Sequence, residues 1–326
     1  MKPFESVQNQ PLLSICIPTY NRAEKLQQCL DHITCQFHDE STKNAIEVVI
    51  SDNASEDNTT QVVKKLQESF DNIRYFRNEK NLGIDKNIIN SVVMASGKYC
   101  WHIGDDDFIQ NGALKFLVDF LSKKEVAVLT VDYRFFTDTG TSLKEDTSIS
   151  EMLITCLDSP EEFYKKGYCQ GTLGIFIFQR DLWMKIDRSS YEEFWSYYEI
   201  ILKMLPSSRL PLAHLNYPLL FLGKDYRWNE GGAGLFTFIN AVKTYKKLAE
   251  FGYSKEFVQH EQDRMSRNLP KIMLSAKGSG LPYSFKNISL IYRSFKGYPL
   301  QLLLTTFIFF LPNTLINKAK KIIRRS

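Results

Sequence analysis

The chain lacks the features that mark several large classes of protein. Its 326 residues carry a formal net charge of only +4, which argues against a general nucleic-acid binder. Its six cysteines form no C-x-x-C pair and show no regular spacing, so we expect buried free thiols rather than disulfides or zinc. The N-terminal residues 1–6 lack the apolar core of a signal peptide, and we therefore expect a cytoplasmic protein.

Two common phosphate-binding motifs are also missing. The first apolar run, 12–18, leads into Thr-Tyr-Asn-Arg and not into the G-x-G-x-x-G loop of dinucleotide-binding proteins. The chain has no G-x-x-x-x-G-K-[ST] loop either. These absences argue against a dinucleotide-dependent enzyme and against a P-loop hydrolase.

Apolar runs alternate with helical patterns through the first half of the chain. The sequence predicts strands at 12–18, 46–50, 73–76, 99–103 and 126–136, and helices at 24–36, 59–70, 84–95 and 112–122. This alternation predicts an α/β fold with a mostly parallel sheet and helices on both faces. In such sheets, ligands bind beyond the carboxyl ends of the strands.

Polar residues gather at the expected carboxyl ends of these strands, at 19–22, 52–53, 78–81 and 105–107. Tyr20 could stack on a nucleotide base, and Asp52 could accept a hydrogen bond from a base N–H. Each also has a structural alternative, as a partly buried tyrosine and as a helix-capping aspartate. The clustering at one edge favours a binding site.

Three consecutive aspartates, Asp105, Asp106 and Asp107, directly follow an apolar run. Adjacent like charges are costly unless a cation balances them, and carboxylate oxygens suit Mg²⁺ or Mn²⁺. The alternative is a solvated acidic turn that begins the next helix. With the polar clusters upstream, we expect a divalent metal.

Four segments in this order resemble the motifs of family 2 glycosyltransferases, which have the Rossmann-like GT-A fold: 14–22, 49–59, 81–83 and the aspartates. Within that family, the runs SDNASEDNT, NLGIDKN and WHIGDDD are most similar to the O-antigen abequosyltransferase group. The resemblance covers about residues 12–205. It implies transfer of a sugar from a nucleoside-diphosphate donor.

The resemblance also implies roles for residues of the donor pocket. Pro18 and Tyr20 would line the base pocket, and Asp52 would contact the base. Arg22 would belong to the same nucleotide-binding set, and Lys86 would approach the ribose or the diphosphate.

The aspartates match the metal motif of the family with one departure. The family pattern is D-x-D followed by another Asp, whereas Gly104 stands at the first of these positions here. Asp106 then matches the metal-binding aspartate, with Asp107 beside it. We expect Asp105 to replace the missing aspartate in contacting the ribose.

An inverting transferase also needs a general base, which the family places at the start of a helix after a strand with a small-residue turn. Residues 171–183 resemble that strand and its continuation, and residues 190–194 are expected to open an amphipathic helix with Glu192 and Glu193. We favour Glu193 over Glu192 as the base. Two glutamates in a first turn could instead merely favour the helix dipole, and a retaining enzyme needs no such base.

The loop 223–234 mixes glycines with a cation and aromatics, as a mobile lid would. Arg227 could meet the diphosphate and Trp228 could stack on a sugar. A surface linker between two domains is the alternative. We expect a transferase domain at 1–230 and a helical C-terminal region at 231–326.

The end of the chain differs from the rest. Residues 300–311 are almost wholly apolar but too few to span a bilayer, which needs about 20 residues. Five Lys or Arg residues and no acid follow within 318–326. This pattern predicts peripheral attachment to anionic lipid at the inner face of the cell membrane, the alternative being a buried helix with a solvated tail.

Taken together, these features predict a metal-dependent hexosyltransferase that acts in bacterial surface polysaccharide synthesis, for O-antigen or capsule. The expected partners are a CDP- or UDP-linked sugar donor, possible donors including a dideoxyhexose such as abequose, and a saccharide acceptor carried on polyprenyl diphosphate. No nucleic acid is expected. The alternatives are a metal-dependent nucleotidyltransferase and a non-catalytic membrane scaffold on a decayed transferase fold.

Overall fold

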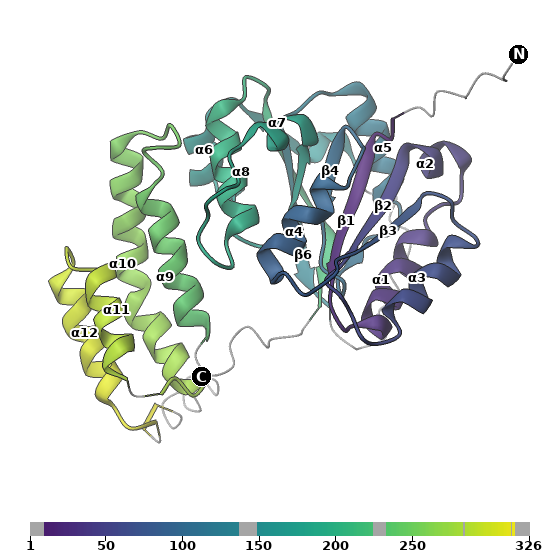
Figure 1. Ribbon diagram of the computed structural model, residues 1–326. Helices are drawn as coiled ribbons and strands as arrows, with labels where there is room; N and C mark the ends of the chain where they lie inside the picture. The colour runs from purple at the N-terminus through teal and green to yellow at the C-terminus, as the bar shows by residue number, and fades with distance from the viewer. Residues whose placement is uncertain (1–9, 137–148, 224–232, 283, 314, 317–326) are drawn as a thin grey trace, which may run out of the picture. The chain divides into compact units, whose positions relative to one another are not determined.

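Four parallel strands form the first half of a nine-stranded sheet, in the order β3-β2-β1-β4 (Figure 1). They are β1 (Leu13–Thr19), β2 (Ile46–Asp52), β3 (Ile73–Arg77) and β4 (Tyr99–His102). Every residue of β2 and β4 is buried, so both faces of the sheet are covered. Near-continuous apolar runs are typical of such doubly covered parallel strands.

The computed structural model describes residues 10–136, 149–223, 233–282, 284–313 and 315–316. Arg227 and Trp228, for which the sequence suggests roles in a lid, lie outside the described residues. The chain forms two units, one of Met1–Asp187 with Lys203–Lys224 and the other of Arg188–Leu202 with Asp225–Ser326. The first unit holds the sheet and the second is helical.

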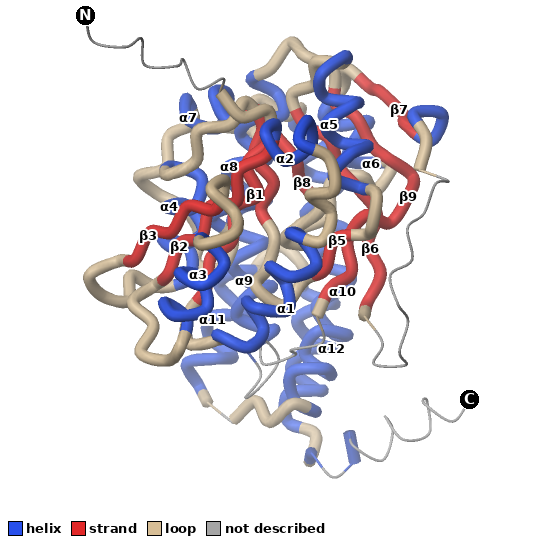
Figure 2. Tube along the Cα trace, turned by 90° about the vertical axis from the view of Figure 1, so that its right-hand side faces the viewer, coloured by secondary structure: helices blue, strands red, loops and turns tan. Residues whose placement is uncertain are grey.

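The second half of the sheet is mixed. β8 (Phe176–Gln179) lies antiparallel to β4, and β6 (Val128–Phe135) lies antiparallel to β8. β9 (Leu212–Leu222) is parallel to β6, and Figure 2 shows β5 (Phe108–Ile109) beside them, antiparallel to β9. β7 (Ile154–Leu157) also pairs with β9. The predicted α/β sheet flanked by helices is confirmed, and the parallel arrangement extends through its first half.

Amphipathic helices cover the sheet of the first unit. In α1 (Ala23–Thr34) the residues Leu26, Cys29, Leu30 and Ile33 are buried, which is the spacing of one helix face. α4 (Ile84–Val93) packs on β1 and β2, and α3 (Thr59–Gln67) packs on β3 and α1. The remaining bounds are α2 (Glu40–Ala45), α5 (Ala113–Lys123), the 3-10 turn η1 (Glu151–Leu153), α6 (Pro160–Lys165) and α7 (Arg180–Lys185).

The strand directions bring several chain segments to one edge. Thr19 at the end of β1 is in register with Asp52 at the end of β2, and Asp52 is in register with Arg77 at the end of β3. β6 and β9 run in the same direction as β4, because each is related to it through the antiparallel strand β8. The carboxyl edge therefore collects the ends of all these strands.

The second unit is built from helices. α8 (Ser196–Ser207) begins in this unit, and α9 (Ala233–Lys246), α10 (Lys255–Gly278), α11 (Phe285–Ser294) and α12 (Pro299–Phe310) lie within it. α10 packs against α9 and α12, and the ammonium of Lys277 lies 5.6 Å from the ring centroid of Phe309. Across the described ranges, no helix has the length and apolar character that crossing a bilayer requires.

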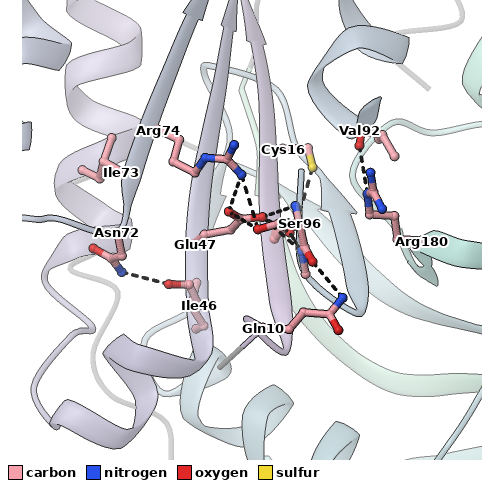
Figure 3. Close-up of polar contacts among 12 residues, drawn as sticks. Gln10, Cys16, Ile46, Glu47, Asn72, Ile73, Arg74, Val92, Ser96 and Arg180 are labelled. Carbon is pink, nitrogen blue, oxygen red and sulfur yellow. Dashed lines mark hydrogen bonds and ion pairs between the residues drawn. The ribbon is translucent and has the colours of Figure 1, made fainter. Parts of the chain in front are cut away.

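One buried carboxylate joins the amino ends of the four parallel strands (Figure 3). Glu47, near the start of β2, accepts hydrogen bonds from the Ser14 hydroxyl at 2.6 Å and from the Arg74 guanidinium at 2.9 Å. The hydroxyl and backbone N–H of Ser96 and the N–H of Gly97, which precede β4, also donate to it. Burial raises the pKa of Glu47, but the bonds from Ser14, Ser96 and Arg74 outweigh burial and leave it below its ordinary value.

We expect Glu47→Gln to lower the free energy of unfolding by about 1–3 kcal/mol, because an amide cannot replace an ionised acceptor of five bonds. Since the folded pKa is depressed, the ionised carboxylate stabilises the fold above the unfolded pKa of about 4.3, and this stability disappears as pH falls through the folded pKa. Urea unfolding between neutral and acid pH measures both effects. The exposed Glu79→Gln is the control, and equal acid slopes in Glu47→Gln and wild type would contradict the assignment.

Candidate functional site

The three aspartates lie at the carboxyl edge, directly after β4, and differ in exposure. Asp105 and Asp107 are 3% and 6% exposed, whereas the Asp106 side chain is 19% exposed. The Thr19 hydroxyl donates to Asp105 at 2.8 Å. The guanidinium of Arg22 bridges two carboxylates, with Nη1 at 2.8 Å from Asp105 Oδ1 and Nη2 at 2.6 Å from Asp106 Oδ2.

Burial changes the protonation of this aspartate cluster, Asp105–Asp107. It raises the pKa of Asp105 to about 6, although Arg22 and Thr19 oppose the shift. It raises the pKa of Asp107 to about 7, and the neighbouring charge of Asp106 adds to the effect. Because burial disfavours the ionised carboxylates, a divalent cation bound beside them would favour their ionised forms.

Two backbone N–H groups hold the Asp107 carboxylate, one from the same turn and one from the distant end of β9. Gly104 donates to its Oδ2 at 2.8 Å, and Gly223, which follows β9, donates to its Oδ1 at 3.1 Å. A Cβ atom on Gly223 would lie only 2.6 Å from the Asp106 carboxylate, so the close approach requires glycine. Sequence reasoning assigned Gly223 no role beyond the first position of a lid loop.

The chemistry of this cluster fits a hard divalent cation. Carboxylate oxygens are the ligands that Mg²⁺ and Mn²⁺ prefer, and Asp106 is the most accessible of the three. Within the described part of the chain, no set of three or more Asp, Glu, His or Cys side chains is arranged to hold a metal. Asp106 instead contacts Arg22, and Lys25 Nζ lies 3.7 Å from the same Oδ2 atom.

Tyr20 and Asp52, which the sequence predicts to contact a nucleotide base, differ in exposure. Tyr20 is 42% exposed just beyond β1, and Pro18 within β1 is half-buried. Asp52 is fully buried: its Oδ1 accepts from the Ser55 N–H at 2.9 Å and its Oδ2 from the Tyr75 hydroxyl at 2.6 Å. Asp52 does not cap a helix, because α3 begins at Thr59 after the N-cap Asn58; its contact with Ser55 lies within the loop that follows β2.

The turn that carries Arg22 is fixed by the loop after β2. Asn21 has a positive φ of 51°, a conformation that asparagine tolerates better than most residues. Its backbone N–H donates to the Ser55 hydroxyl at 2.8 Å, and its side-chain oxygen accepts from the Glu56 N–H at 2.7 Å. The first helical N–H, of Ala23, donates to a carboxylate oxygen of the same loop. The loop therefore sets the position from which Arg22 reaches the aspartates.

A buried amide on α4 ties the ends of β1 and β2 together. Asn87 donates to the carbonyls of Thr19 at 3.2 Å and Ser51 at 2.9 Å, and it accepts from the Ser51 hydroxyl and from Asn78. Sequence reasoning assigned Asn87 no role, although an asparagine on the apolar face of a helix is a usable signal. Its neighbour Lys86 is exposed in the first turn of α4.

The two glutamates considered as a base lie in the second unit, before α8. The sequence predicts a helix from residue 190, but α8 begins at Ser196 because Phe194 has a positive φ of 67°, which no helix accommodates. Glu192 pairs with Lys247 at 2.7 Å and with Lys243 at 3.5 Å. Glu193 is exposed, and its carbonyl accepts from the Asn240 amide.

Two curated proteins are similar to part of this chain. Abequosyltransferase RfbV of Salmonella typhimurium is 41% identical over 114 residues, which cover 35% of this chain and 33% of that protein. A GalNAc(5)-diNAcBac-PP-undecaprenol beta-1,3-glucosyltransferase of Campylobacter jejuni is 36% identical over 110 residues, which cover 33% and 34% respectively. The similarity thus spans about one third of the length of each relative.

Solved structures show the same fold over nearly the whole chain. The S. aureus protein TarS, residues 1-349 in complex with UDP, covers 95% of this chain and 91% of its own, with a TM-score of 0.55 at 15% identity. The mannosyltransferase PcManGT of Pyrobaculum calidifontis, in complex with GDP-Man and Mn²⁺, covers 97% and 88% with a TM-score of 0.56 at 15% identity. Residues 14–184, more than half of the chain, match the family model described as Glycosyl transferase family 2. The chain therefore belongs to glycosyl transferase family 2 and has the GT-A fold.

Proposed function

We propose that the chain is a metal-dependent glycosyltransferase that moves a sugar from a nucleoside-diphosphate donor to a saccharide acceptor. The observation that carries this proposal is the convergence of the aspartate cluster with Thr19 and Arg22 at the carboxyl edge. Such an edge is where α/β sheets bind ligands, and a site that combines carboxylates with a guanidinium suits a metal-bound diphosphate.

The donor's nucleoside would bind over the ends of β1 and β2. Pro18 and the exposed ring of Tyr20 would line the base pocket, and Asp105 would face the ribose. To contact the base, Asp52 would have to accept a hydrogen bond from it in place of the bond that the Tyr75 hydroxyl donates. If the Tyr75 bond is kept, the buried Asp52 would instead form part of the pocket floor. Lys86, exposed at the start of α4, would approach the diphosphate together with Arg22.

Asp106, supported by Asp107, would hold Mn²⁺ or Mg²⁺. A divalent cation bound there stabilises the negative charge that grows on the leaving diphosphate. The Mn²⁺ complex of the structurally similar mannosyltransferase supports a metal in this fold. The hydrogen bonds from Gly104 and Gly223 would keep both oxygens of Asp107 oriented beside the metal ligand.

For an inverting reaction, Glu193 is the better candidate for the general base. A base must accept a proton from the acceptor hydroxyl, so it needs a carboxylate that is open to substrate. Glu193 is exposed, whereas Glu192 pairs with Lys243 of α9 and with Lys247, the residue after α9.

The relatives suggest what the donor and acceptor are. One is an abequosyltransferase and another carries an undecaprenol-linked substrate in its name. We propose a CDP- or UDP-linked sugar, with a dideoxyhexose such as abequose as one candidate, and a polyprenyl-diphosphate-linked saccharide acceptor in O-antigen or capsule synthesis. The family match favours this reading over a nucleotidyltransferase or a decayed scaffold.

We also propose that the helical region 231–326 attaches the transferase domain, 1–230, to the inner face of the cell membrane. One face of α12 presents large apolar side chains to solvent, while Leu302, Thr305 and Phe309 on the opposite face are buried. The basic residues of 318–326 would add attraction to anionic lipid. The apolar stripe consists of Leu300, Leu303, Leu304, Phe307 and Phe310, which are 48–67% exposed.

The function is tested by titrating the full chain with UDP and with CDP, each with and without Mn²⁺, in a calorimeter. We expect one of the two nucleotides to bind in a metal-dependent manner. Asp106→Asn should weaken that binding about 100-fold or more, which exceeds the usual cost of losing a group that only supports a metal ligand. The control is Asp119→Asn on α5, where the carboxylate is exposed and pairs only weakly with Lys115. Wild-type affinity in Asp106→Asn would remove the metal assignment.

The base assignment is tested by comparing Glu193→Gln with Glu192→Gln in a sugar-transfer assay. Glu193→Gln should lower kcat by about 10²–10⁴-fold, the usual contribution of a general base, with unchanged nucleotide binding. Glu192→Gln removes the partner of Lys243 and Lys247 and should mainly lower the melting temperature. A fully active Glu193→Gln enzyme would rule out this base and would agree with a retaining reaction.

Membrane attachment is tested by flotation of the full chain with vesicles of phosphatidylcholine, with or without phosphatidylglycerol. The double variant Leu303→Gln with Phe307→Gln should bind at least about tenfold more weakly, because each side chain contributes on the order of 1.5–3 kcal/mol when fully buried. The matched control is Val93→Gln with Met94→Gln, which changes two exposed apolar residues of the first unit. Equal flotation of both double variants would show that the stripe is not the attachment surface.

A further inference from the structure

We propose that Arg22 is an internal counter-ion that competes with the metal for Asp106 and is released when the donor's diphosphate arrives. The inference rests on the proposed function and concerns the order of events at the same site. It predicts that the protein without a nucleotide binds metal weakly, and that nucleotide and metal strengthen each other's binding.

The competition follows from the atoms that Arg22 occupies. Its two terminal nitrogens bridge Asp105 Oδ1 and Asp106 Oδ2 at 2.8 and 2.6 Å, so the planar guanidinium spans two carboxylates. Such charge-assisted, two-pronged contacts are the strong class of hydrogen bonds. Because Asp106 is also the most accessible carboxylate, a divalent cation approaching it meets a positive charge already in contact with one of its two oxygens.

The backbone around Arg22 is fixed, so the side chain alone must move. The Asn21 turn is pinned by Ser55 and Glu56, and the carbonyl of Arg22 accepts the Leu26 N–H at the start of α1. The long side chain is 23% exposed and lies at the edge where the diphosphate would bind. Arginine forms the same two-pronged contact with phosphate as with carboxylate, so the diphosphate offers Arg22 an equivalent partner.

Lys25 provides an internal comparison. Its ammonium approaches the same Asp106 oxygen, at 3.7 Å, but its side chain is 41% exposed and it lies farther from that oxygen than the Arg22 nitrogen does. Exposed ion pairs of this kind contribute little, since solvent screens them and the side chain must be ordered. Removing Lys25 therefore takes away one positive charge near the metal ligand without removing the bridge.

The release of Arg22 links the two ligands energetically. A nucleotide that draws Arg22 away from Asp106 frees a metal ligand, and a metal on Asp106 frees Arg22 to meet the diphosphate. By thermodynamic reciprocity, each must raise the affinity for the other by the same factor. A neutral residue at position 22 no longer competes with the metal for Asp106. The nucleotide and the metal should then strengthen each other's binding less, because no arginine moves between Asp106 and the diphosphate.

The experiment titrates Mn²⁺ alone into the full chain, with free Mn²⁺ followed by electron paramagnetic resonance, and then repeats the titration with the nucleotide that binds. Without nucleotide, Arg22→Gln should bind Mn²⁺ about tenfold more tightly than wild type, as expected for the loss of a partly buried charged competitor. Lys25→Gln should change the affinity less than about threefold, the scale of an exposed pair. Arg22→Gln with Asp106→Asn should lose the gain, which assigns it to Asp106.

The effect of nucleotide on Mn²⁺ affinity gives a second test of the role of Arg22. Addition of nucleotide should raise the Mn²⁺ affinity of wild type by a larger factor than that of Arg22→Gln. Mn²⁺ binding by Arg22→Gln that equals wild type, or is undetectable, would overturn the counter-ion role. The nucleotide-free comparison does not use the donor, so a wild-type chain that binds neither nucleotide would refute the proposed function separately. Melting curves confirm that each variant is folded.

Discussion

Three adjacent carboxylates at the end of a buried strand are the constraint on which the rest of this site depends. Burying them is tolerable only because donors reach them from the end of β1, from the turn before α1 and from the end of β9. The turn that supplies Arg22 is held by the loop after β2, and Asn87 fixes the ends of both strands. The polar residues at the carboxyl edge therefore form a connected support for the aspartate cluster.

The first half of the fold could be predicted because its signals are local. The apolar runs of β1 to β4 and the helical patterns between them gave bounds within a few residues of those observed. The pairings of β5, β7 and β9 were not anticipated, because β5 and β7 are short and all three pair with segments far along the chain. The start of α8 was predicted too early, because Phe194 has a positive φ, which the local sequence does not predict.

For the site, sequence identified the residue types but not their contacts. The aspartates, Tyr20 and Arg22 stood out as polar groups at strand ends, and the structure places the aspartates and Arg22 together. The contribution of Gly223 depends on a separation of 116 residues, which no local pattern encodes. The carboxylate of Asp52 was expected to face a ligand, yet the structure surrounds it with Ser55, Tyr75 and Arg77, since only the folded sheet shows which side chains are within reach.

The Glu47 network bears on how such a sheet can change over evolutionary time. It fastens the four parallel strands at their amino ends, whereas the aspartates and the residues proposed for the nucleotide lie at their carboxyl ends. Substitutions in the carboxyl-edge loops therefore leave one anchor of strand register intact. A sheet anchored in this way tolerates substitutions in its ligand-facing loops, because the register of its strands does not depend on those loops alone.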